Sequence, residues 1–197
     1  MHGLVTTALK RYLVRRLGSV VWNRLLVDQN LAQRDYVPRG TYPDREVIGL
    51  VSGAASVTCT PMQELLEDFG RCLVPELLKS FGALINPSWR TLDVIEHSDA
   101  TIHRAVRLRE PDASPPRLAL TRSGPDEVVV EYSSARGLCS LAKGIIRGIA
   151  DHFGDKVSIE EPSCRGHGSP CCVILVSLEP PARDAQVASH HVPHRAG

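Results

Sequence analysis

The segment EVVVEYSSARGLCSLAKGIIRGIADHF, residues 127–153, decides the fold. Its first part is rich in valine and follows the turn residues Ser123-Gly124-Pro125-Asp126, which predicts a strand over 127–133. From residue 137 onward apolar residues recur every three or four positions, which predicts a helix over 137–153. A strand followed directly by an amphipathic helix indicates a sheet with a helix packed on it. The apolar residues with helical spacing are Leu138, Leu141, Ile145, Ile149 and Phe153.

The segments on either side extend this sheet. Residues 104–109 (RAVRLR) and 117–122 (RLALTR) alternate apolar and polar side chains, which is typical of half-buried strands. Two more strands are expected near 156–161 and 172–178. The C-terminal half is therefore predicted to form an antiparallel sheet. The last residues, 181–197, show no periodic pattern, and we expect a disordered tail there.

The N-terminal half is predicted to be helical, because its apolar residues recur at helical spacing. Thr60 is expected to cap one of these helices, with Pro61 at its first position, and Pro75 should bend or shorten that helix. We expect helices over residues 3–17, 19–27 and 44–57, from Thr60-Pro61 through Pro75, and from Asn86-Pro87 towards His103.

Composition places the chain among ordinary globular proteins. It has 197 residues, of which 43% are hydrophobic and 23% charged, with a formal net charge of +1. This charge gives no reason to expect nucleic acid or an anionic membrane as a partner. No apolar run approaches the roughly 18 residues of a membrane span. We therefore expect a cytoplasmic protein whose six cysteines are kept reduced.

A polar trio follows the valine-rich strand. Tyr132, Ser134 and Arg136 alternate along the chain, so a strand would present two hydroxyls and a guanidinium on one side. Such a set suits a carboxylate or phosphate, and a nearby histidine such as His103 can ligate a metal through its neutral imidazole. A ligand with two carboxylates and a metal centre is haem. The alternatives are purely structural: Arg136 would pair with an acidic side chain, and Tyr132 would be a packing residue of the strand.

In order and spacing, these residues resemble the haem nitric-oxide/oxygen-binding (H-NOX) domains. The N-terminal sequence Met1-His2-Gly3-Leu4-Val5 is similar to the family's opening. His103 falls at the proximal iron ligand and keeps the spacing to Arg136, which the rival His97 does not. Pro116 falls at the proline that distorts the haem, and the Tyr-Ser-Arg trio falls where the propionates are held. The family commonly has an aspartate three residues before this histidine, whereas Asp99 lies four before it.

The resemblance implies an α+β fold over residues 1–180. It places a helical distal part at 1–85 and a proximal α/β part at 86–180, with a four-stranded antiparallel sheet and packed helices. Haem b would lie between the two parts. Nitric oxide would weaken the bond from iron to His103, free its helix and let the haem relax away from Pro116.

The resemblance also implies which residues form the distal pocket, and these residues indicate which gas the haem would bind. None of its side chains can donate a hydrogen bond, and Leu141 stands where oxygen-binding members have a tyrosine. We therefore predict a sensor that binds nitric oxide and carbon monoxide and largely excludes oxygen. The implied pocket residues are Val5, Leu9, Leu73, Leu77, Leu141 and Ile145.

Cysteines cluster near the C-terminal strands, in a pattern that suits a tetrahedral zinc site. Cys139, Cys164 and Cys172 match a zinc-bearing subset of the family. The fourth ligand is left open among His167, slightly favoured, Cys171 and Glu161. The alternatives are free buried thiols or one disulfide formed on oxidation. The two other cysteines, Cys59 and Cys72, are expected to be core thiols.

No catalytic motif stands out, so we expect a sensor rather than an enzyme. Its partner would be a signalling protein, such as a histidine kinase or a cyclic-dinucleotide enzyme, and a homodimer is plausible. Two other functions remain open at this point. One is a zinc and thiol redox sensor in the same fold, and the other is a small-molecule-binding module without haem. The histidines of the tail, His190, His191 and His194, are expected to be solvated.

Overall fold

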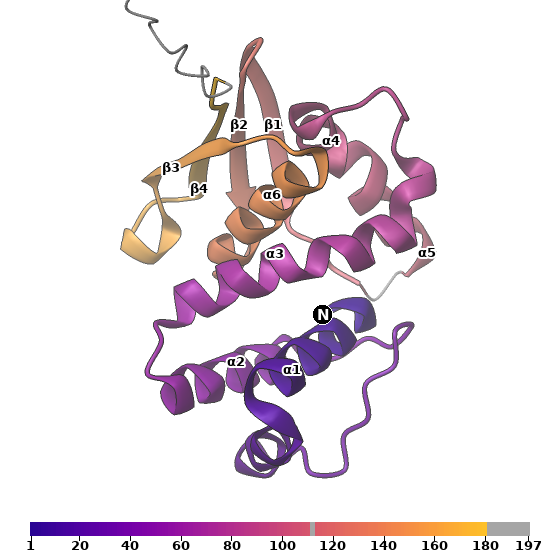
Figure 1. Ribbon diagram of the computed structural model, residues 1–197, viewed down its shortest axis with the longest axis vertical. Helices are drawn as coiled ribbons and strands as arrows, with labels where there is room; N and C mark the ends of the chain where they lie inside the picture. Colours follow the sequence, from indigo (N-terminus) through magenta and orange to yellow (C-terminus); the bar gives the residue numbers. More distant parts are fainter. Residues whose placement is uncertain (111–112, 181–197) are drawn as a thin grey trace, which may run out of the picture.

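A computed structural model describes residues 1–110 and 113–180 of the chain. Within these residues it confirms the α+β fold, with N-terminal helices and a four-stranded antiparallel sheet (Figure 1). The predicted tail at 181–197 lies outside the described residues. None of the described helices is both long and apolar enough to cross a membrane.

The N-terminal unit is built from α1 (Gly3–Asp28) and α2 (Asp44–Thr58), which pack against α3 (Met62–Phe81). α1 consists of two helical pieces joined at Gly18, whose φ of 85° lies in the region that favours glycine. The break agrees with the two helices expected there. The His2 side chain caps α1 by accepting a hydrogen bond from the backbone N–H of Leu4.

α3 departs from the prediction at its start. Pro61, rather than Thr60, is the capping residue, and the Thr60 hydroxyl donates to the Thr58 carbonyl instead of capping the helix. α3 then continues through Pro75 to Phe81. The two cysteines expected in the core, Cys59 and Cys72, are both exposed, so that expectation is wrong. Cys72 lies on the solvent side of α3, and Cys59 ends α2 in a left-handed conformation.

The expected strand over 104–109 is also wrong. Helix α4 (Thr91–Ser98) continues into a π-helical turn, Asp99–His103, and then into α5 (Arg104–Arg109). The alternation in this segment is not strict, because Ala105 and Val106 are adjacent apolar residues, and over six residues such a pattern does not separate a strand from a short helix. Ile102 and Val106, four residues apart, contact the same internal cavity. His103 therefore lies within a helical segment and not just before a strand.

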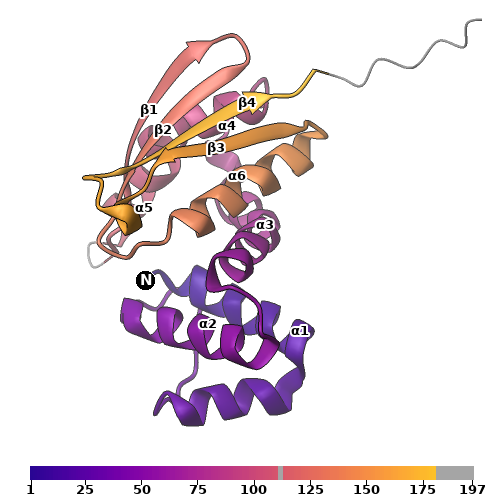
Figure 2. The same cartoon turned by 90° about the vertical axis from the view of Figure 1, so that its left-hand side faces the viewer.

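The sheet has the order β1-β2-β4-β3, with β1 (Arg117–Gly124), β2 (Glu127–Ser133), β3 (Val157–Ser163) and β4 (Cys172–Leu178), all antiparallel to their neighbours. Alternate residues of the central strands are buried, as one covered face requires. Helices α4 and α6 (Cys139–Phe153) lie on that face (Figure 2). The buried strand residues are Val128, Val130 and Tyr132 of β2 and Cys172, Ile174 and Val176 of β4.

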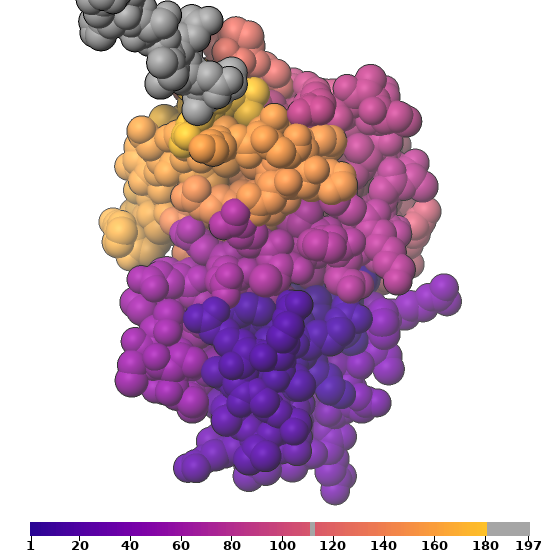
Figure 3. All heavy atoms as spheres, viewed as in Figure 1, coloured from indigo at the N-terminus to yellow at the C-terminus, as the bar shows by residue number. Residues whose placement is uncertain are grey.

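α3 joins the N-terminal unit to the sheet, and its atoms lie between those of α1 and α6 (Figure 3). The contact between α3 and α6 depends on glycine, because there is no room for a side chain. A Cβ at Gly144 would lie 2.1 Å from the Glu67 carbonyl oxygen, and one at Gly70 would lie 2.4 Å from the Leu141 carbonyl oxygen. The two helices therefore touch backbone to backbone, which ties the two units closely.

Candidate haem and metal sites

His103 lies on the wall of a large, mostly apolar cavity. Its Nδ1 is 3.2 Å from Asp99 Oδ1. A carboxylate only accepts hydrogen bonds, so Nδ1 carries the hydrogen and Nε2 keeps its lone pair. Burial lowers the pKa of His103 by more than Asp99 raises it, which favours the neutral imidazole. Nε2 has no hydrogen-bond partner among residues 1–110 and 113–180, so its lone pair is available to coordinate a metal ion.

Asp99 and His103 are four residues apart in the π-helical turn, and their side chains lie on the same side of it. In such a turn the hydrogen bonds run from i to i+5, so residues four apart lie on nearly the same side. Arg107 Nη2 also donates to Asp99, at 2.9 Å from Oδ2. Burial raises the pKa of Asp99, but its hydrogen bonds from Arg107 and His103 outweigh burial and leave it lowered. Asp99 thus stays a carboxylate that orients the imidazole.

The cavity lies between the two units and takes residues from both. It is lined by Val5 of α1, Leu73 and Leu77 of α3, and Leu141 and Ile145 of α6, as expected for the distal pocket. Pro116 lines it as well. Leu9 does not, because it lies one turn beyond Val5 and is buried in the N-terminal core at 1% exposure.

The Tyr-Ser-Arg trio is only partly assembled at the cavity. Tyr132 and Arg136 line it, whereas Ser134 does not, because β2 ends at Ser133 and the alternation stops there. The Ser134 hydroxyl instead accepts from the backbone N–H of Arg136 at 3.2 Å. Burial raises the pKa of Tyr132, which keeps the phenol protonated and able to donate.

Arg136 has an acidic partner that the sequence did not single out. Its Nε donates to Asp44 Oδ2 at 2.6 Å, across 92 residues of chain. The expected alternative, pairing with an acidic side chain, therefore occurs. A guanidinium has five N–H groups, however, and the described residues bond only the one on Nε, so a carboxylate can still be bound.

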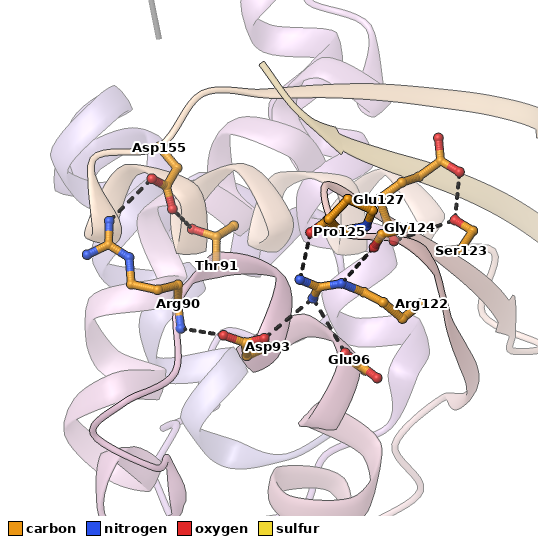
Figure 4. Close-up of polar contacts among 10 residues, drawn as sticks. All are labelled: Arg90, Thr91, Asp93, Glu96, Arg122, Ser123, Gly124, Pro125, Glu127 and Asp155. Carbon is orange, nitrogen blue, oxygen red and sulfur yellow. Dashed lines mark hydrogen bonds and ion pairs between the residues drawn. The ribbon is translucent and has the colours of Figure 1, made fainter. Parts of the chain in front are cut away.

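The helix that leads to His103 is anchored at its start (Figure 4). Asp155, after α6, accepts from the Thr91 hydroxyl at 2.6 Å and from Arg90 at 3.3 Å. Arg122 of β1 lies 3.4 Å from both Asp93 and Glu96. These contacts attach α4 to the sheet unit on two sides.

The other end of the segment contacts the N-terminal unit. Glu110, just after α5, lies 2.7 Å from His2 Nε2. Since His2 also caps α1, this contact links the end of the His103 segment to the first residues of the other unit.

A second group of ligand-type side chains lies between α6, β3 and β4. It consists of Cys139, Glu161, Cys164 and Cys172, whose ligand atoms all lie within 4.8 Å of one another. Cys164 Sγ is 3.9 Å from Cys139 Sγ and 3.8 Å from Cys172 Sγ. A tetrahedral zinc with bonds of about 2.3 Å separates its sulfurs by roughly 3.8 Å. The spacing thus suits a shared cation, and all three are free thiols in this structure.

The fourth member of this group is Glu161 and not the favoured His167. His167 is exposed, in the short 3-10 turn Arg165–His167, and Cys171 is half-buried outside the group. Glu161 Oε1 is buried and has no hydrogen-bond partner among the described residues. Burial raises the pKa of Cys139 and of Cys172, so a cation would have to displace their protons.

Comparison with known proteins agrees with this geometry. The family model described as Haem-NO-binding matches residues 2–161. No curated protein sequence matches the chain. The solved H-NOX protein from S. oneidensis in its Fe(II)NO ligation state is 26% identical, with a TM-score of 0.86 over 91% of this chain and 100% of that chain.

Two further solved structures share the fold. The H-NOX domain from Shewanella oneidensis in its Fe(II)CO ligation state is 26% identical, with a TM-score of 0.81 over 91% of this chain and 99% of that chain. The Fe(II) unliganded H-NOX protein from K. algicida is 17% identical, with a TM-score of 0.83 over 93% and 99% of the two chains. Because the family model spans most of the chain, the protein belongs to the haem-NO-binding (H-NOX) family, whose domains bind haem as gas sensors.

Proposed function

We propose that the protein is a nitric oxide sensor in which His103 is the axial ligand of a ferrous haem. The observation that carries the proposal is an imidazole on the wall of an apolar cavity, with its Nδ1 bonded to Asp99 and its Nε2 left without a partner among the described residues. The residues present fit the group, since Tyr132 and the free N–H groups of Arg136 can hold its propionates. Ser134 would support that turn. When bound, haem supplies an iron that takes up nitric oxide or carbon monoxide.

The side chains of the distal wall determine which gas the iron would bind. The lining residues assigned to this wall are aliphatic and offer no donor to an oxygen ligand; they are Val5, Leu73, Leu77, Leu141 and Ile145. Donors elsewhere on the lining are already bonded: the Met1 ammonium to the Tyr42 carbonyl and Asp44, both ring nitrogens of His2 to Leu4 and Glu110, and the Ser98 hydroxyl to the Ile95 carbonyl. We therefore infer that oxygen gains no hydrogen bond there and is largely excluded. The S. oneidensis relatives solved with nitric oxide and carbon monoxide support these two ligands.

The signal would leave through the segment that bears His103. α4 is fixed to the sheet by Arg90, Thr91 and Arg122 at its start, whereas α5 reaches the N-terminal unit through Glu110 and His2. Release of His103 would therefore move the α5 end rather than the anchored end. We infer that a partner, such as a histidine kinase or cyclic-dinucleotide enzyme, detects this shift, with the sensor alone or as a homodimer.

We also propose a zinc ion, bound by Cys139, Cys164, Cys172 and Glu161. Two observations favour it, the near-tetrahedral sulfur spacing and the unpartnered Glu161 Oε1. This site leaves a zinc and thiol redox sensor as the second candidate function, because oxidation of the thiolates would release the metal.

An absorption spectrum of the ferrous full chain separates these functions. We expect a strong Soret band that shifts with nitric oxide and with carbon monoxide, but not with air. An oxygen complex stable in air would overturn the gas assignment. Absence of the band after expression with ample haem would overturn haem sensing and leave the redox sensor or a haem-free module. A response of partner activity to peroxide but not to nitric oxide would favour the redox sensor.

A further inference from the structure

Lys143 contacts the proposed metal site without being a candidate ligand. Its Nζ lies 2.9 Å from Glu161 Oε2 and 3.1 Å from Glu67 Oε1. Its side chain is only 17% exposed. We propose that Lys143 is a positioning residue that holds Glu161 so that Oε1 alone serves the metal. This inference rests on the zinc site proposed above.

The fold brings Lys143 between the two carboxylates. It lies four residues after Cys139 on α6, so the two share one face of the helix. α6 lies between β3, which carries Glu161, and α3, which carries Glu67 (Figure 2). The missing side chain of Gly144 lets the backbone at Glu67 approach α6. Lys143 is therefore fixed from both neighbouring layers.

The two oxygens of Glu161 are used differently. Oε2 accepts from Lys143, whereas Oε1 is buried without a nitrogen or oxygen donor in the described part of the chain, and its neighbours are the weakly donating thiols of Cys139 and Cys164. A buried carboxylate oxygen with only weak thiol donors costs free energy, which a cation among the three sulfurs would recover. Because Lys143 occupies Oε2, Glu161 is limited to one metal bond, which gives three sulfurs and one oxygen.

Lys143 also balances charge. Three thiolates and a carboxylate around one divalent cation carry a net charge of −2, in a site that is largely buried. The ammonium group of Lys143 is the cation within hydrogen-bond distance of Glu161 among the described residues. Partners of this kind, behind the ligands, typically account for about 10- to 100-fold in metal affinity.

The test compares Lys143→Met with Arg147→Met in the full chain. Arg147 follows one turn later on α6 and also faces Glu67, at 3.7 Å, but makes no ion pair with Glu161 among the described residues, so it controls for the lost pairing to α3. Zinc affinity is measured by competition with a chromophoric chelator. We expect about 10- to 100-fold weaker binding in Lys143→Met, and an unchanged affinity in Arg147→Met and in the conservative Lys143→Arg.

The coordination of the bound metal is a second measurement, and it would not change if Lys143 served only the stability of the fold. In the cobalt-loaded protein, Lys143→Met should change the visible ligand-field bands, because Glu161 becomes bidentate or gives way to water. Adding Lys143→Met to Glu161→Gln should weaken zinc binding no further, since Lys143 acts through Glu161. Equal affinities and equal cobalt spectra in the Lys143→Met and Arg147→Met variants would overturn the role of Lys143. Failure of the unaltered chain to bind zinc or cobalt would instead overturn the metal site itself.

Discussion

The two candidate metal centres differ in what they connect. The cavity beside His103 is shared by the N-terminal helices and the sheet unit, and only one side chain, His103, is proposed to bond the iron. The cysteine group lies within one unit, on α6, β4 and the end of β3 with the residue that follows it, and offers four candidate ligands. A centre between two units, held by one protein bond, can change their relative position when that bond changes. A closed centre within one unit stiffens that unit for as long as its metal is bound.

The two centres nevertheless adjoin. Cys172 lies opposite Tyr132 in the pairing of β2 with β4, and Cys139 precedes Leu141 of the cavity by two residues. A stiff metal site would therefore hold the strand end and the helix turn that frame the haem cavity. The predictions that follow test whether the two centres have these separate roles.

The largest effect is expected from His103→Gly. This change removes the imidazole whose Nε2 is free, so the ferrous spectrum of histidine-ligated haem should disappear and return on adding imidazole. His97→Ala is the control, because the His97 ring packs on Trp89, at 4.5 Å between ring centroids, and does not line the cavity. Loss of ligation in His97→Ala, with a normal spectrum in His103→Gly, would reverse the assignment.

Cys172→Ser should abolish stabilisation by zinc. A metal present at 100 times its dissociation constant raises the free energy of unfolding by about 2.7 kcal/mol. Urea unfolding with and without zinc should show this gain in the unaltered chain and in the exposed control Cys72→Ser, but not in Cys172→Ser. The iron–His103 spectrum should persist in all three. Loss of histidine ligation on zinc removal would show that the centres are not separate.

Leu141→Tyr should raise oxygen affinity, because it adds a donor to an aliphatic wall. A hydrogen bond to a charged partner contributes roughly 1.5–3 kcal/mol, which corresponds to about 10- to 100-fold in affinity. Oxygen titration of the ferrous protein measures the effect, and Leu141→Phe controls for the added ring. Equal oxygen affinity in the Tyr and Phe variants would mean that the wall is not next to the ligand.

The sequence predicted those features that depend on local pattern. Helices, strands and the cavity residues Val5, Leu73 and Leu141 follow from periodicity and from the resemblance. The segment 104–109 was misassigned because six residues are too few to separate the two periodicities. Leu9 was misplaced because one helical turn decides whether a residue meets the cavity or the core.

The ligand sets show the same limit. The resemblance singled out Cys139, Cys164 and Cys172, which the structure brings together, but Glu161 rather than His167 lies beside them, at a register shift of β3 between Glu160 and Ser163. Pro162 within the strand is a local signal for such an irregularity, but it does not say which side chain the irregularity turns toward the cysteines. The pairing of Arg136 with Asp44 joins distant positions and left no signal. Lys143 did leave one, its spacing of four from Cys139 on a predicted helix.

Pro116→Ala should give the smallest effect. It tests whether the sheet unit presses on the haem. Pro116 directly precedes β1 and lines the cavity, and its ring is the bulk that the resemblance assigns to haem distortion. Alanine removes that bulk, so the haem should flatten and its out-of-plane resonance Raman bands should weaken, while His103 stays bonded. Pro115→Ala is the matched control, since Pro115 also lines the cavity. Equal changes in both variants would mean that the loop as a whole, rather than Pro116, shapes the haem. A change in Pro116→Ala alone would mean that the sheet unit presses on the haem at one point. Such a contact would couple the shape of the haem to the position of the sheet unit relative to the N-terminal unit.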